Sequence, residues 1–72
     1  MEPRDAIDVS VNGERLQVPA GTTLTGLLDR LALDATRLAV EHNLNVVPRA
    51  EYSGRILQAG DRVEVVTFVG GG

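Results

Sequence analysis

The chain is short and acidic, with 72 residues, a net charge of −3 at pH 7, no cysteine and a single histidine, His42. The absence of cysteine excludes disulfides and thiolate metal centres. The single histidine argues against a zinc site, and the acidic charge argues against nucleic-acid binding. A domain this small has little room for an enclosed active site, which favours a carrier or binding role over a self-contained enzyme. No apolar run approaches the ~20 residues that span a bilayer, and the N-terminus lacks the apolar core of a signal peptide, so we expect a soluble, cytoplasmic protein.

The first part of the chain has the pattern of a β-hairpin. Apolar and polar residues alternate over residues 7–11, which predicts a half-buried strand. Asn12-Gly13 follows, and both residue types tolerate the positive φ angles of a type I′ turn. The alternation resumes through Leu16 and Val18 and stops at Pro19, so we expect the return strand there.

A short amphipathic helix is expected next. Thr22 or Thr23 can serve as its N-cap, because a hydroxyl accepts a hydrogen bond from an unpaired backbone N–H. The leucines that follow recur at helical spacing on one stripe, which predicts a helix of about ten residues packed on the sheet. They are Leu24, Leu27, Leu28 and Leu31.

Three further strands are expected, over residues 38–41, 46–47 and 62–68, and the last is rich in the β-branched residues that strands favour. Residues 43–45 predict a turn between the first two. Residues 49–53 predict an irregular or single-turn segment, with Ile56 and Leu57 packed beneath it.

The order of these elements predicts the fold. A helix between a hairpin and later strands should cross over right-handedly onto one face of the sheet. We therefore expect an α+β fold of the β-grasp (ubiquitin-like) type, a mixed sheet of four to five strands with one main helix on one face. The domain should span residues 7–68, with a disordered extension over 1–6 and a flexible tail over 69–72.

The two faces of the final strand should differ. Val63 and Val65 make the better core face, so Val66 and Phe68 should point outward beside the tail. Exposed apolar side chains often mark a partner surface, and we expect Val66, Phe68 and Val69 to bind a partner. The alternative is that a loop or the end of the helix covers Val66 and Phe68.

The chain ends in three glycines, Gly70, Gly71 and Gly72. Glycines at a chain end can be a frayed terminus, but a tail without Cβ atoms can also thread a narrow channel. A carboxylate is a poor electrophile, and it becomes reactive once it attacks the α-phosphate of ATP to form an acyl-adenylate, in a site that excludes water. The ending therefore suggests a carrier whose reacting group is its own terminal carboxylate.

Taken together, these segments resemble the ThiS family of thiamine-biosynthesis sulfur carriers. The resemblance covers nearly the whole chain from about Ile7, and the most specific parts are the Val-Pro-Arg segment and the Phe-Val-Gly-Gly-Gly ending. The matching stretches are Val11-Asn12-Gly13, Gly21-Thr22-Thr23-Leu24, Ala39-Val40-Glu41, Val46-Val47-Pro48-Arg49, Gly60-Asp61-Arg62-Val63-Glu64-Val65-Val66 and Phe68-Val69-Gly70-Gly71-Gly72.

The resemblance implies a function and a set of partners. Gly71 and Gly72 correspond to the family's terminal diglycine, and Gly70 belongs to the tail that threads into the partner. An E1-like, ATP-dependent enzyme (ThiF-like) would adenylate the Gly72 carboxylate, and a sulfur donor such as a cysteine desulfurase would convert it to a thiocarboxylate. The carrier would then give its sulfur to a ThiG-like thiazole synthase. It would bind no cofactor, nucleic acid or membrane.

Three other interpretations remain open. A MoaD-like small subunit of molybdopterin synthase shares the fold and the thiocarboxylate chemistry. A non-covalent β-grasp binding module would not need the terminal glycines. An enzyme in its own right has little support, because Glu41, His42 and Asp61 are dispersed along the chain and each is expected to be solvated, with Asp61 a turn residue.

Overall fold

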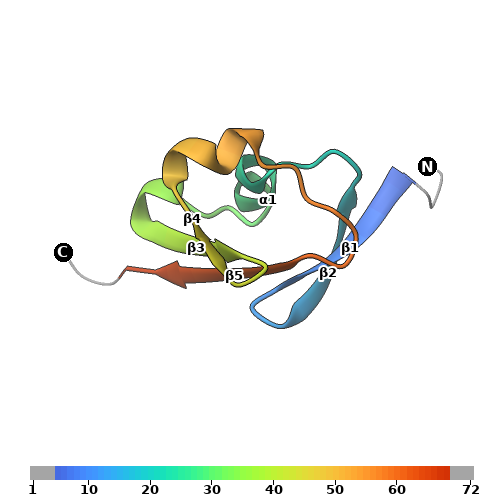
Figure 1. Ribbon diagram of the computed structural model, residues 1–72, viewed down its shortest axis with the longest axis horizontal. Coiled ribbons are helices and arrows are strands. Elements are labelled where there is room, and N and C mark those ends of the chain that lie inside the picture. Colours follow the sequence, from blue (N-terminus) through green and yellow to red (C-terminus); the bar gives the residue numbers. More distant parts are fainter. Residues whose placement is uncertain (1–4, 69–72) are drawn as a thin grey trace.

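The structure, a computed structural model, describes residues 5–68 and contains one sheet with its helices on one face (Figure 1). Within this range, no helix is long and apolar enough to cross a membrane. The elements in chain order are β1 (Ala6–Val11), β2 (Glu14–Pro19), α1 (Leu24–Arg30), the 3-10 helix η2 (Ala35–Arg37), β3 (Leu38–His42), β4 (Asn45–Val47), the 3-10 helix η3 (Arg49–Gly54) and β5 (Arg62–Thr67).

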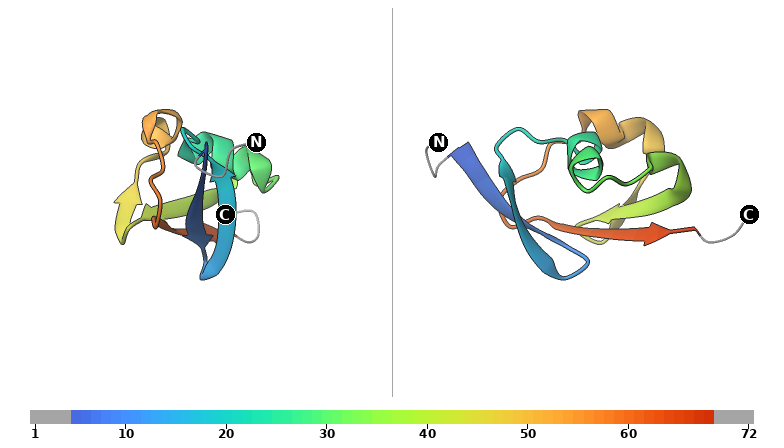
Figure 2. Two further views of the ribbon diagram at one scale, coloured as in Figure 1. Left: turned by 90° about the vertical axis from the view of Figure 1, so that its right-hand side faces the viewer. Right: turned by 180° about the vertical axis from the view of Figure 1, so that it is seen from behind.

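The sheet has the strand order β2-β1-β5-β3-β4. β5, the last strand of the chain, lies at its centre, parallel to β1 and antiparallel to β3. The views in Figure 2 show α1 and η3 together on one side of this sheet, which leaves its other side open. The expected α+β fold of the β-grasp type, with a mixed sheet and one main helix, is confirmed.

The first hairpin forms as its sequence predicts. Asn12 and Gly13 have φ angles of 50° and 87°, as a type I′ turn requires. β1 begins at Ala6, one residue before the expected start, and the carbonyl of Asp5 accepts a hydrogen bond from the N–H of Ala20 at 2.7 Å. Both residues belong to the folded part of the chain, whereas residues 1–4 lie outside the described range.

The helix is capped as expected but is shorter. The Thr23 hydroxyl accepts a hydrogen bond from the Gly26 N–H at 3.1 Å, while α1 has 7 residues rather than about ten. Its end is a Schellman motif, in which Ala32 takes a φ of 57° and the Leu33 N–H donates to the Leu28 carbonyl at 2.9 Å. The left-handed residue of a Schellman motif is usually glycine. Here it is Ala32, which gives no stop signal in the sequence, so the leucine stripe suggested a longer helix.

The core lies between the sheet and the helices. Its fully buried side chains come from α1, from the inner faces of β1, β2, β3 and β5, and from the segment before β5; the largest are Leu24, Leu27, Leu28, Leu57, Val9, Val18, Val40 and Val63. Leu57 is buried as expected, but the expectation that Ile56 is buried with it is wrong, since Ile56 is 53% exposed. Ile56 forms an antiparallel bridge with Thr23, and in extended chain adjacent side chains face opposite sides.

A second expectation that the structure corrects concerns His42 and Asp61, which are buried rather than solvated and lie side by side. His42 lies at the end of β3, with its side chain on the inner face of the sheet, and its Nε2 is 2.6 Å from Asp61 Oδ2. Asp61 also accepts hydrogen bonds from the Asn43 side chain at 3.1 Å and from the Gln58 N–H at 2.8 Å. The network ties the β3–β4 turn to the start of β5.

The hydrogen bonds also determine the ionisation of Asp61. Burial raises the pKa of this carboxyl, but the hydrogen bonds from the Gln58 N–H, His42 and Asn43 outweigh that effect and hold its pKa below the ordinary value of 3.8. His42 Nε2 is the ring nitrogen that faces the Asp61 carboxylate, and His42 Nδ1 is buried without a hydrogen-bond partner in the described range. Because its pKa is lowered on folding, ionised Asp61 stabilises the fold above about pH 3.8, and this contribution disappears as the pH falls through its folded pKa.

Replacing Asp61→Asn should lower the free energy of unfolding by about 1–3 kcal/mol at pH 7, since a charged acceptor of three hydrogen bonds is lost. The difference from the unmodified protein should shrink as the pH falls below about 3.8, and urea unfolding between pH 7 and pH 2.5 measures it. Asp29→Asn, on the exposed side of α1, is the control and should change stability by less than about 0.5 kcal/mol. A difference that stayed constant over this pH range would contradict the role given to the carboxylate.

The β3–β4 turn gives a second prediction. Leu44 is 68% exposed and has a φ of 74°, a left-handed conformation that is unfavourable for a residue with a Cβ atom. Leu44→Gly should raise the free energy of unfolding by up to about 1 kcal/mol, because the relief of strain exceeds the entropy that glycine adds to the unfolded chain. Ala50→Gly, in η3 at a negative φ, should be destabilising. Loss of stability in both variants would show that Leu44 is not strained.

Candidate functional site

The outer face of β5 carries the candidate partner surface. Val63 and Val65 are buried, at 0% and 8% exposed, whereas Val66 and Phe68 are 62% and 60% exposed. The inward and outward faces of this strand are therefore as the sequence predicts, and neither a loop nor the helix end covers the two outward side chains. The alternation along β5 predicts that Thr67 shares the inner face with Val63 and Val65, but Thr67 is exposed because the strand ends there.

Two contacts hold the end of β5 in place. β1 pairs with β5 only through Ser10 and Val11, so the rest of β5 has no strand beside it on that edge. The Asn12 side chain pairs with β5 there in place of a strand. Its Oδ1 accepts a hydrogen bond from the Val65 N–H at 2.7 Å and its Nδ2 donates to the Val65 carbonyl at 3.0 Å. On the other edge the Phe68 N–H donates to the Arg37 carbonyl at 2.8 Å.

The pairing of the Asn12 side chain with the Val65 backbone was not predicted from the sequence. The Asn-Gly pair indicated only that Asn12 is a turn residue. Glycine or aspartate would also fit the turn, but only an amide presents the donor and the acceptor that pair with both backbone groups of one residue. The sequence signal for this pairing was the presence of asparagine at a turn position where glycine would also fit.

The remaining predicted site residues are Val69, Gly70, Gly71 and Gly72, and they lie outside the described residues. The structure shows what precedes them. β5 runs to one end of the molecule, away from the end where β1 begins (Figure 1), so the chain leaves the sheet beside the exposed side chains of Val66 and Phe68.

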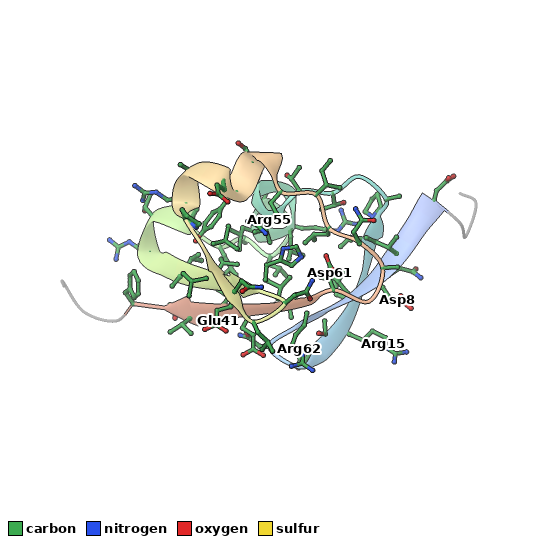
Figure 3. All side chains as sticks on the ribbon, viewed as in Figure 1. Asp8, Arg15, Glu41, Arg55, Asp61 and Arg62 are labelled. Carbon is green, nitrogen blue, oxygen red and sulfur yellow. The ribbon has the colours of Figure 1, made fainter. Side chains whose placement is uncertain are left out.

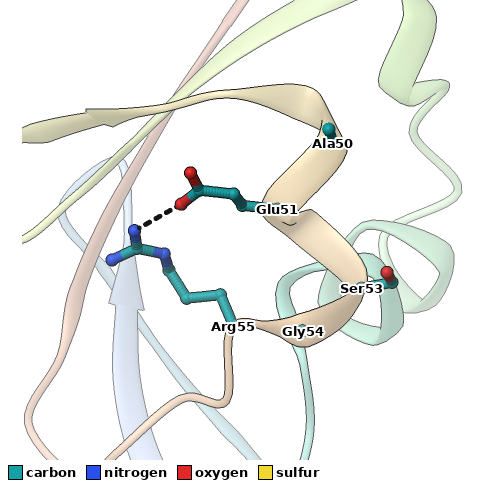
Figure 4. Close-up of a pocket in the computed structure, with 5 residues that line it drawn as sticks. All are labelled: Ala50, Glu51, Ser53, Gly54 and Arg55. Carbon is teal, nitrogen blue, oxygen red and sulfur yellow. Dashed lines mark hydrogen bonds and ion pairs between the residues drawn. The ribbon is translucent and has the colours of Figure 1, made fainter.

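Within residues 5–68 no three His, Cys, Asp or Glu side chains gather as a metal site. An open depression on η3 is lined by Ala50, Glu51, Ser53, Gly54 and Arg55 (Figure 4). Its Glu51 and Arg55 form an exposed ion pair at 2.9 Å, one helical turn apart, and the depression lies on the helix side of the sheet, away from the outer face of β5.

The charged side chains point to both sides of the sheet. Figure 3 shows Glu41 and Arg62 on the side of the sheet opposite α1, and Asp61 on the α1 side. His42 and Asp61 therefore belong to the interior and not to the candidate partner surface. Glu41 is exposed, as expected.

Comparisons with known proteins agree with this arrangement. The family model of the ThiS family matches residues 3–72. The crystal structure of the thiamine biosynthesis protein ThiS from Geobacter metallireducens superposes with a TM-score of 0.79 at 32% identity, over 92% of this chain and 100% of that one. The sulfur carrier protein ThiS of Escherichia coli is 29% identical over 66 residues, which are 92% of this chain and 100% of that protein.

A larger protein is also similar. The thiazole synthase of Magnetococcus marinus is 47% identical over 64 residues, which are 89% of this chain. The chain spans about a fifth of the length of the thiazole synthases that it matches.

The family match, the superposition over the whole of a ThiS structure and the β-grasp fold agree. The chain belongs to the ThiS family, the ubiquitin-like sulfur carriers of thiamine biosynthesis.

Proposed function

We propose that the carboxylate of Gly72 carries the sulfur atom that this protein delivers for thiazole formation. The observation that carries the proposal is the match to the ThiS family, which extends to residue 72 and therefore includes the terminal glycines. In this proposal the carrier supplies only the reacting group, and partner enzymes supply the catalysis.

The chemistry begins at the carboxylate. One of its oxygens attacks the α-phosphate of ATP in an E1-like, ThiF-like enzyme, pyrophosphate leaves and an acyl-adenylate forms. The terminal sulfur of a persulfide on a cysteine desulfurase then attacks the acyl carbon, and AMP leaves with the oxygen. A thiol cleaves the resulting acyl disulfide by reduction, which leaves the thiocarboxylate on Gly72. The use of ATP supports the cytoplasmic location expected from the sequence.

The body of the protein presents the tail. Asn12 and the Arg37 carbonyl fix the end of β5, so the tail begins at a defined point. Gly72 is four residues after Phe68 in the sequence. Val66 and Phe68 offer a partner enzyme an apolar surface at this point. A partner that binds this surface can place the carboxylate in an active site that excludes water.

The thiazole synthases support a ThiG-like acceptor. One polypeptide of Magnetococcus marinus, named a thiazole synthase, contains a segment that is 47% identical to this chain. A carrier segment in the same polypeptide as the enzyme is expected where the two act on each other. This similarity favours thiazole formation over the MoaD-like alternative.

Activation by the adenylating enzyme tests the proposal. The full chain should support exchange of labelled pyrophosphate into ATP by the ThiF-like enzyme of the same organism, and removal of Gly71 and Gly72 should reduce this exchange at least about 100-fold, because the acceptor carboxylate is displaced from the reacting phosphate. A non-covalent module predicts the opposite result, with the binding activity intact after the deletion.

The partner surface gives a separate prediction. Val66→Asp should raise the KM of the carrier in the exchange reaction about tenfold without unfolding the domain, because it places a charge on an exposed apolar contact residue. Thr67→Asp is the matched control, since it adds the same charge to the next residue of β5, and it should change KM less. Equal kinetics for Val66→Asp and the unmodified protein would exclude Val66 as a contact residue.

A further inference from the structure

Two asparagine side chains hold the two ends of β5. Asn12 in the β1–β2 turn and Asn43 in the β3–β4 turn both have left-handed backbones, with φ angles of 50° and 52°. Asn43 Oδ1 accepts a hydrogen bond from the Arg62 N–H at 2.8 Å, at the start of the strand. The Asn12 amide pairs with the N–H and the carbonyl of Val65, near the end of the strand. Two turns of the same geometry therefore hold opposite ends of one strand.

Asn12 bonds to β5 at two successive positions on one edge. Its backbone N–H donates to the Val63 carbonyl at 2.9 Å, and its side chain pairs with Val65. Val65 is the next residue that faces this edge, because alternate residues of a strand direct their N–H and carbonyl groups to the same side. β1 ends at Val11, so the Asn12 amide extends the pairing of β1 with β5 by one step beyond the last paired backbone.

Water can replace the hydrogen bonds of this amide but not its position. Asn12 is exposed, so a freed N–H and carbonyl of Val65 would bond to water, which is nearly as favourable as a direct hydrogen bond. β3 would still pair with β5 from Val63 to Thr67. A water molecule is not attached to the chain, however, and cannot fix the direction of the strand. The Asn12 amide therefore affects the direction of the end of β5 more than the stability of the fold.

The direction of this strand end matters because the reacting carboxylate follows it closely. Val65 is seven residues before Gly72 in the sequence. A tail that leaves the domain in a variable direction brings its carboxylate to the reacting phosphate in a smaller fraction of complexes. The rate of a reaction between positioned groups is sensitive to such errors, since a misplacement of about 1 Å can cost roughly 100-fold.

We propose that Asn12 is a positioning residue for the reaction of Gly72. By holding Val65, its amide fixes the direction in which β5 ends, and it raises the fraction of enzyme-bound carriers whose carboxylate reaches the α-phosphate of ATP. This inference rests on the proposed function, because it takes the reaction to be the adenylation of Gly72. Asn12 acts through β5 and needs no contact with the enzyme, so it determines kcat, whereas a residue that contacts the enzyme determines KM.

Asn12→Gly and Asn43→Gly are a matched pair of test variants. Glycine fits both left-handed positions without steric cost, and each change removes two side-chain hydrogen bonds. In pyrophosphate exchange by the ThiF-like enzyme of the same organism, Asn12→Gly should lower kcat about tenfold and leave the KM of the carrier within about twofold. Asn43→Gly frees the start of β5, away from the tail, and should change each constant by less than about twofold.

Asn12→Asp is a second variant that adds no glycine flexibility to the turn. Asp-Gly is also a preferred pair in type I′ turns. An ionised carboxylate still accepts from the Val65 N–H but offers no donor to the Val65 carbonyl. Its kcat should therefore also fall, with KM close to that of the unmodified protein.

Amide hydrogen exchange measures the hold on the strand without any enzyme. The Phe68 N–H donates to the Arg37 carbonyl at 2.8 Å, so its exchange requires the end of β5 to open locally. Asn12→Gly should speed this exchange about tenfold at a temperature where the variant is folded, and Asn43→Gly should not. A lower kcat with unchanged exchange at Phe68 would overturn the proposal, since Asn12 would then act by touching the enzyme.

Three other results would also overturn it. They are an unchanged kcat in Asn12→Gly, an equal loss of kcat in Asn12→Gly and Asn43→Gly, and a loss confined to KM. The proposed function fails on a different result, in which the enzyme binds the unmodified protein and yet catalyses no exchange with it, and the positioning role then fails as well. If exchange occurs and Asn12→Gly keeps the full kcat, adenylation stands and the positioning role does not.

Discussion

The central position of β5 is the constraint on which the rest of the structure depends. This strand joins the two halves of the sheet, since β1 and β2 lie on one side of it and β3 and β4 on the other. Its inner valines complete the core, its outer residues form the exposed face, and its end is where the tail begins. A shift of β5 by one residue would exchange its two faces and bury Glu64 and Val66 in place of Val63 and Val65. Register, core and partner surface are therefore determined together.

Several features of the surface around β3, β4 and β5 reduce the stability of the fold. Leu44 adopts a left-handed conformation at an exposed turn, and Glu41 and Glu64 repel each other on an open sheet face. A domain of this size buries only about 60% of its unfolded surface, so its stability margin is small. The Asn12 side chain holds the end of β5 on the edge where β1 no longer pairs with it, and the hydrogen bonds of Asp61 tie the start of β5 to the β3–β4 turn. Strain of this kind is expected on surfaces whose favourable contacts form only with a partner.

The parts of the fold that follow from local sequence could be predicted, and those that depend on distant residues could not. Alternation along β5 gave its inner and outer faces, and hence the exposure of Val66, because a half-buried strand has a period of two. Ile56 was placed wrongly because its direction is determined by a single bridge to Thr23, a residue far away in the sequence. His42 and Asp61 are 19 residues apart and each is ordinary by itself, so their contact emerges only when β3 and β5 are paired.

The most direct test of the central claim is the mass of the intact protein from its own cells, grown without thiamine. Met1 is the single methionine, and its oxidation gives nearly the same mass change as the exchange of one oxygen for sulfur, so the sample is treated with a thiol-alkylating reagent and the adduct is located by fragmentation. Because the chain has no cysteine, the account predicts an adduct at Gly72 and nowhere else. An unmodified Gly72, both in these cells and after incubation with the E1-like enzyme, ATP and a sulfur source, would contradict it.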